Sequence, residues 1–145
     1  MKRWCLLLAF TLFTLLGTLL VAHAQCNSEP LVDEVLNFLK EKNFNFLKSY
    51  KIDGQKGTNK EVEYSYVFSA GTTYMIVVNN GVKNAEGIII TVEDAERNEI
   101  AKSFIGDTYV PAVQIICNRT GIYYLRFTLV DKKHDCAAAV LGFKR

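Results

Sequence analysis

Residues suited to acid–base catalysis are few in this chain. It contains two histidines, His23 and His134, and His23 lies in an N-terminal segment that we expect to be removed. His134 lies in the charged segment 131–135, where a solvated loop histidine is the expected role. The sequence contains no G-x-S-x-G, H-E-x-x-H or phosphate-loop pattern. We therefore predict no catalytic residue; a small hydrolase that relies on His134 or on carboxylates is the enzymatic alternative.

Two groups of carboxylates could bind or react. Glu61 and Glu63 alternate along a predicted strand, which places them about 7 Å apart on one face and could mimic a glycosidase pair. A solvated strand face explains this pair more simply. Residues 93–98 are a predicted turn, and its carboxylates Glu93, Asp94 and Glu96 could hold Ca²⁺, but the turn lacks the spacing and the glycine of an EF-hand loop. We predict no metal and no cofactor, with calcium at this turn as the alternative.

The cysteines predict one disulfide and one unpaired thiol. Cys5 leaves with the N-terminal segment, so Cys26, Cys117 and Cys136 remain. Cys117 ends one predicted strand, and Cys136 begins the antiparallel return of the next strand, 122–130. Their sulfurs should then lie at opposite ends of a strand about 25 Å long, whereas a disulfide needs Cα atoms within about 7 Å. We expect Cys26 to pair with one of these two cysteines, with Cys136 as the first candidate.

Tyrosines in the predicted strands are the candidate ligand-binding residues. Tyr123 and Tyr124 are adjacent, so their side chains point to opposite faces of a sheet. An exposed tyrosine can stack on a sugar ring. Tyr109, Tyr123 and Tyr124 are the residues selected on this basis.

The N-terminus has the order of a secretory signal peptide. A basic start is followed by an apolar run over residues 4–21 and by an A-x-A site that ends at Ala24. We expect cleavage after Ala24, so residues 1–24 are a signal peptide and residues 25–145 form one exported domain. The expected location is the periplasm, the cell surface or the extracellular space.

Two alternatives for this segment are weaker. An uncleaved anchor helix is possible by length, because about 20 apolar residues span a bilayer, but no basic flank follows the cleavage site. A lipoprotein would be acylated at Cys26, yet a lipobox requires a small residue before its cysteine and Gln25 stands there. We expect no stable membrane span after cleavage.

The charge of the mature domain argues against nucleic acid as a partner. Removal of Lys2 and Arg3 reduces the 17 basic residues to 15, equal to the 15 acidic residues. No basic stripe remains that would attract a phosphate backbone.

Hydrophobic periodicity predicts one helix followed by strands. Ser28 and Pro30 open the helix, which is expected to end near residues 42–43. Its apolar stripe comprises Leu31, Val35, Phe38 and Leu39. From Phe46 the period becomes two. The expected strands cover residues 46–52, 62–68, 74–78, 87–92, 99–105, 111–117, 122–130 and 136–143.

These elements predict a mainly β fold. The strand at 87–92 is apolar on both faces and should be central in its sheet. We expect an antiparallel two-sheet sandwich of jelly-roll type, with about eight strands and one N-terminal amphipathic helix.

Four segments carry a family resemblance. Residues 117–125 (CNRTGIYYL) and 136–141 (CAAAVL) resemble a family of small, uncharacterised exported proteins from Gram-negative bacteria, and residues 69–74 (SAGTTY) and 90–94 (ITVED) extend the likeness. The order of these motifs is similar to that of the pre-peptidase C-terminal (PPC-like) type of β-sandwich. Those modules accompany secreted enzymes without being catalytic, so the resemblance implies a sandwich fold and a non-enzymatic role.

The sequence thus favours a non-catalytic protein-interaction or structural module of the cell envelope. A carbohydrate-binding module of the periplasm or cell surface is the alternative, and a small hydrolase is third. The expected partner is a protein or a glycan, and the sequence leaves its identity and the oligomeric state open.

Overall fold

The computed structural model describes residues 26–54, 61–130 and 136–145. The predicted signal peptide, residues 1–24, and His134 lie outside the described residues. The elements are α2 (Glu29–Glu41), β1 (Asn45–Asp53), β2 (Glu61–Phe68), β3 (Thr73–Asn79), the short 3₁₀ helix η2 (Lys83–Ala85), β4 (Ile88–Glu93), β5 (Glu99–Lys102), β6 (Phe104–Ile105), β7 (Thr108–Tyr109), β8 (Ala112–Ile116), β9 (Gly121–Leu129) and β10 (Cys136–Lys144).

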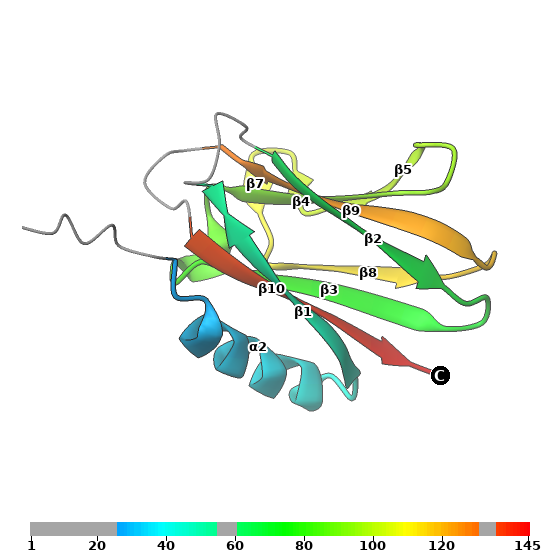
Figure 1. The fold of residues 1–145 in the computed structure, drawn as a ribbon, viewed down its shortest axis with the longest axis horizontal. Helices are drawn as coiled ribbons and strands as arrows, with labels where there is room; N and C mark the ends of the chain where they lie inside the picture. Colours follow the sequence, from blue (N-terminus) through cyan, green and yellow to red (C-terminus); the bar gives the residue numbers. More distant parts are fainter. Residues whose placement is uncertain (1–25, 55–60, 131–135) are drawn as a thin grey trace, which may run out of the picture.

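Two antiparallel four-stranded sheets pack face to face. The helix-side sheet has the strand order β1-β10-β3-β8, and the open sheet has the order β2-β9-β4-β5. Figure 1 shows α2 below the helix-side sheet, with the open sheet as the layer above. The main core lies between the sheets, where Phe68 stacks between Tyr74 and Tyr123 with ring centroids 3.9 and 4.6 Å away. Burial of such side chains is the main favourable term in folding.

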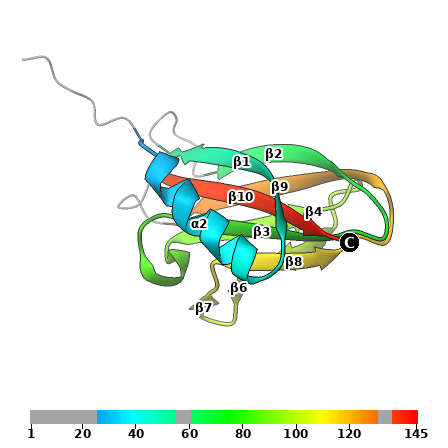
Figure 2. The same cartoon turned by 90° about the horizontal axis from the view of Figure 1, so that it is seen from below.

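The helix covers the outer face of one sheet only. It lies across β10, β3 and β1 (Figure 2), and its Val35 and Leu39 are buried against Met75 and Val140 of that sheet. It ends at Glu41, and Asn43 follows in a left-handed conformation, φ 59°. The predicted helix and its boundaries are therefore confirmed.

The prediction of a single strand over residues 99–105 is wrong. Ser103 is fully buried and interrupts the strand, because its hydroxyl accepts the N–H of Ile90 at 2.7 Å. The chain then turns at Gly106, φ 58°, to form a separate ribbon from β6 and β7. The described residues hold ten strands rather than about eight: eight in the two sheets and two in this ribbon.

The predicted antiparallel return of strand 122–130 by strand 136–143 is also wrong. β9 pairs with β2 and β4, whereas β10 pairs with β1 and β3, so the two successive strands belong to different sheets. The disulfide prediction is confirmed nonetheless: Cys26 is bonded to Cys136, with Cα atoms 5.1 Å apart. Cys117 is a buried free cysteine.

Candidate functional site

The helix leaves the outer face of the open sheet uncovered. The α-helix of the described chain packs on the opposite sheet. Antiparallel pairing of β2, β9 and β4 arranges the side chains of this face in rows across the strands. The rows are Glu61, Thr128 and Ile89; Glu63, Arg126 and Thr91; Ser65, Tyr124 and Glu93; and Val67 and Ile122.

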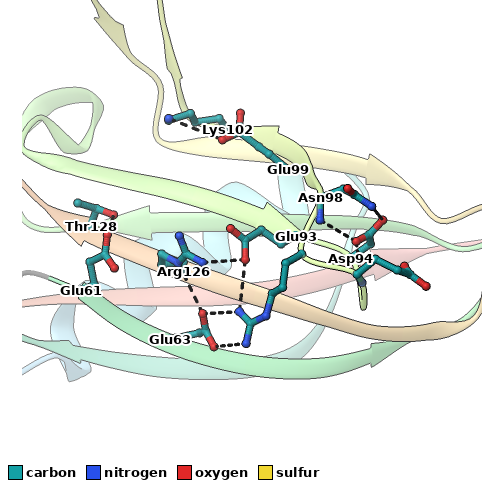
Figure 3. Close-up of polar contacts among 11 residues, drawn as sticks. Glu61, Glu63, Glu93, Asp94, Asn98, Glu99, Lys102, Arg126 and Thr128 are labelled. Carbon is teal, nitrogen blue, oxygen red and sulfur yellow. Dashed lines mark hydrogen bonds and ion pairs between the residues drawn. The ribbon is translucent and has the colours of Figure 1, made fainter.

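Two arginines and two glutamates meet in the middle of this face, and we call them the charged cluster: Glu63, Glu93, Arg97 and Arg126. The Arg97 guanidinium donates to both carboxylate oxygens of Glu63, at 2.8 and 3.1 Å, and to Glu93 at 3.3 Å. Arg126 donates to Glu93 at 2.8 Å and lies 3.5 Å from Glu63. Figure 3 shows Glu63, Glu93 and Arg126 converging from three neighbouring strands. The cluster is electrically balanced, with two charges of each sign.

A tight turn between β4 and β5 places Arg97 over the sheet. Asp94 organises this turn, because its carboxylate accepts the N–H groups of Glu96 and Asn98 and the side-chain amide of Asn98. These bonds, led by the one from the Asn98 side chain, hold the pKa of Asp94 below its usual value. Arg97 itself has φ 68°, a left-handed conformation that costs energy for a residue with a side chain. The contacts that the Asp94 carboxylate makes within the turn hold this conformation.

The cluster fixes the ionisation and the position of its members. Hydrogen bonding from Arg97, supported by the charge of Arg126, holds the pKa of Glu63 below its usual 4.5 even though partial burial opposes this shift. The same bond to Glu63 raises the pKa of Arg97. The Arg97 guanidinium also lies over the Tyr124 ring, 3.4 Å from the ring centre. Contacts within the chain thus hold Arg97 and Tyr124 in place.

The prediction of a solvated Glu61–Glu63 face is confirmed, since both residues are exposed, and the structure adds the partners of each carboxylate. The two side chains do share one strand face, but Glu63 is bound by two arginines and Glu61 accepts a hydrogen bond from Thr128 at 3.3 Å. A glycosidase acid requires a raised pKa, and the pKa of Glu63 is shifted the other way.

The three carboxylates considered for calcium point to different partners. Glu93 pairs with the cluster arginines, Asp94 caps its own turn, and Glu96 pairs with Arg119 at 2.8 Å. Within residues 26–54, 61–130 and 136–145, no three Asp, Glu, His or Cys side chains converge as a metal site.

An exposed apolar pair lies beside the charged cluster. Val67 and Ile122 face each other across β2 and β9 and are 57% and 47% exposed. With Ser65 and Tyr66 they line an open depression of about 470 Å³. The face therefore combines an apolar pair, an aromatic ring and ordered arginines, and arginine and tyrosine are enriched at protein interfaces.

The three tyrosines predicted to bind a ligand lie in three different environments in the structure. Tyr123 is buried in the core, its hydroxyl donates to the Arg119 carbonyl at 3.0 Å, and burial raises its pKa to about 12. Its selection as a ligand-binding residue is therefore wrong. Tyr124 lies on the outer face, as the alternation required, but the Arg97 guanidinium occupies its ring, so this ring is not a free platform for a sugar.

Tyr109 lies at another part of the surface. It packs on Phe104 across the β6–β7 ribbon, with ring centroids 4.8 Å apart. It lines a polar depression of about 270 Å³ together with Lys83, Asn84, Glu86, Asp107 and Thr108.

Sequence reasoning did not single out Arg97 or Arg126. Arg97 lies in the predicted turn 93–98, and the sequence of a turn does not show over which strand its side chains lie. The polar alternation of Tyr124, Arg126 and Thr128 along β9 is the signal that could have marked this face.

A scan against models of protein families finds no match, and a search of curated proteins finds none. Among solved structures, the chain is similar to PliG of Aeromonas hydrophila, a periplasmic lysozyme inhibitor of g-type lysozyme. The TM-score is 0.47 and the sequence identity 14%, over 71% of this chain and 90% of that chain. In the described residues, no helix has the length and hydrophobicity to cross a membrane.

Proposed function

We propose that this chain is an exported, non-catalytic module that binds another protein through the outer face of its open sheet. The binding face comprises the charged cluster, Tyr124 and the apolar pair Val67 and Ile122. Export is supported by the predicted signal peptide and by the Cys26–Cys136 disulfide, which is typical of oxidising compartments.

One observation carries this proposal: an exposed apolar pair lies next to an arginine–tyrosine stack that is already ordered. Interface residues that are fixed before binding lose less conformational entropy when the complex forms. Central apolar and aromatic anchors with a polar rim are the usual anatomy of a protein interface. The ion pairs satisfy the charges of the cluster within the chain, which leaves Val67 and Ile122 as the apolar anchors.

Affinity capture with matched variants tests the proposal. Ile122→Asp places a charge on the binding face, and Ile116→Asp makes the same change at an exposed isoleucine of β8, on the opposite face of the sandwich. From the exported fraction of the native host, we expect a partner protein to be retained by the wild type and by Ile116→Asp, and lost with Ile122→Asp. Retention by all three, or loss with both variants, contradicts the proposed face.

A carbohydrate-binding role is the second candidate, because the Tyr109 depression combines an aromatic ring with amide, hydroxyl and carboxylate groups. Sugar ligands stack on aromatic rings and hydrogen-bond to such groups. Titration with a glycan panel is the test, with Tyr109→Ala and Phe46→Ala as matched aromatic deletions; Phe46 lies exposed on β1. Binding that only Tyr109→Ala removes would favour this candidate, and no binding to any glycan would eliminate it.

We also propose that the sandwich is of the jelly-roll type. The strand orders β1-β10-β3-β8 and β2-β9-β4-β5 support this, because successive strands mostly alternate between the two sheets. The PPC-like relationship remains a proposal that rests on the four sequence motifs.

A further inference from the structure

We propose that two copies of this chain pair through the edge of β2, which among the described residues pairs with β9 alone, antiparallel to each other, so that their open sheets join into one continuous sheet. The proposal rests on how differently β2 and the other three sheet edges are built. It is independent of the binding face, since a monomer and a dimer both leave the outer face of the open sheet uncovered.

The other three edges carry the features that prevent strand addition. β1 has an irregular register between Phe46 and Lys48 and exposes Lys48 and Lys51. β5 spans only Glu99–Lys102, with a shifted register against β4. β8 spans only Ala112–Ile116 and lies beside β5.

β2 is neither short nor irregular and has no lysine, and its exposed charges are those of Glu61 and Glu63. Its register with β9 is unbroken from Glu61 to Phe68, and the strand contains no proline, glycine or lysine. A long, regular edge of this kind offers a row of backbone donors and acceptors to another strand.

The side chains of β2 that face the core also indicate an open flank. Val62, Tyr64 and Tyr66 are only half-buried, whereas their neighbours on β9, Tyr123, Leu125 and Phe127, are buried. The depression lined by Ser65, Tyr66, Val67 and Ile122 reaches β9 and belongs to the outer face, so the half-buried core-facing side chains are the observation that marks the flank of β2.

The pattern of β2 is complementary to itself. Opposite residues of an antiparallel pair lie on the same face, so the registers with the longest overlap place the two-fold axis at Tyr64 or at Ser65. Glu63 then lies opposite Ser65 or Val67 of the second copy, and no carboxylate faces another. On the inward face, Tyr64 lies opposite Tyr64 or Tyr66 of the second copy, and aromatic cross-strand pairs are favourable. Within its own chain, Tyr64 already packs on Tyr50 and donates to the Lys51 carbonyl of β1, so this ring is held in place at the flank of β2. This fit is the reason for naming a second copy as the occupant.

Sedimentation velocity over a range of concentrations tests the proposal on the mature chain. In one register, Ser65→Glu puts a carboxylate opposite Glu63 of the second copy. In the other register, the two substituted positions face each other, so the new carboxylates should repel in both arrangements. Ser65→Thr is the control at the same position, and Gln114→Glu is the matched charge control on the β8 edge. We expect a monomer–dimer equilibrium for the wild type and both controls, and a monomer for Ser65→Glu at the same concentrations.

Hydrogen exchange of the wild type provides a second readout that needs no variant. Amides of β2 should exchange more slowly as the concentration rises, while those of β8 should not change. A wild type that stays monomeric up to millimolar concentration, a dimer that Ser65→Glu leaves intact, or concentration-dependent protection absent from β2 would overturn the proposal. If Ser65→Glu does not fold, the exchange result alone decides.

Discussion

Arg97 contacts three different parts of the binding face. Its guanidinium pairs with Glu63 and Glu93 and covers the ring of Tyr124. At this scale the sequence predicted little: the turn at residues 93–98 was recognised, but the left-handed backbone of Arg97 depends on the Asp94 cap and on partners far away along the chain. By contrast, the opposite orientations of Tyr123 and Tyr124 follow from strand geometry alone and were predicted.

Glu93 is the cluster residue whose loss should affect stability most. It is 7% exposed and satisfies two arginines. Glu93→Gln should lower the free energy of unfolding by about 1–2 kcal/mol, because the amide that replaces the carboxylate has no negative charge to pair with the two arginines. Glu99→Gln, at an exposed residue opposite Glu93 on β5, should change it by less than about 0.5 kcal/mol. Urea unfolding of both variants measures this, and equal losses would contradict the role given to Glu93.

The lowered pKa of Glu63 makes a pH prediction. A carboxyl whose pKa is lower in the folded state stabilises the fold above its unfolded value and loses this contribution as pH falls through the folded value. The stability difference between the wild type and Glu63→Gln should therefore be full above about pH 5 and shrink as pH falls below the usual value of 4.5. Urea unfolding across this range tests it, and a difference that grows toward acid pH would contradict the assigned pairing.

At the scale of elements, hydrophobic periodicity predicted the helix and most individual strands well, but it predicted the pairing of the strands poorly. The hydrophobic period alone predicts the apolar stripe of the helix and the alternation of β2. The two apolar faces of β4 predicted a central strand, and β4 does lie between β9 and β5. The split at Ser103 was not predictable, since it depends on a hydrogen bond to Ile90 in another strand. The partners of β10 were not predictable either, because period specifies which face of a strand is apolar and not which sheet it joins.

The contact between α2 and the helix-side sheet depends on one glycine. A Cβ at Gly142 would lie 2.9 Å from Leu39 and 3.1 Å from the Asn45 carbonyl oxygen, so Gly142→Ala should force the helix away from β10. We expect it to lower the free energy of unfolding by about 1–3 kcal/mol. Gly121→Ala, where an added Cβ meets nothing within 4 Å, is the control. Chemical unfolding with hydrogen exchange of α2 measures both, and equal effects would contradict this packing.

At the scale of the whole molecule, the Cys26–Cys136 disulfide joins the start of the domain to its last strand. The cysteines are 110 residues apart in sequence, so the bond restricts nearly the whole unfolded chain. Cys26→Ala/Cys136→Ala should lower the free energy of unfolding by about 2–4 kcal/mol. Cys117→Ala should leave the disulfide in place, which non-reducing peptide mapping checks. Recovery of a Cys117–Cys136 peptide pair from the wild type would contradict the pairing.

The overall architecture explains why one face is free to act. The sequence predicted a sandwich with one helix, and the position of that helix decides which sheet is covered. Val35 and Leu39 bury the outer face of the helix-side sheet, and the open sheet keeps its polar rows. The helix covers the sheet that contains β10. Because the strand pattern does not show which sheet β10 joins, it does not predict which face the helix covers.

Site-specific photocrosslinking tests the binding face most directly. A photoreactive residue at Ile122 would report contacts of the outer face, and the same residue at Ile116 would report contacts of the opposite side. In the native host, we expect a discrete adduct with another protein at Ile122 that Arg97→Ala weakens, and no such adduct at Ile116. An adduct with twice the mass of the chain would be a second copy and would not count as the partner. No adduct at Ile122, or the same adduct at both positions, would contradict the central claim.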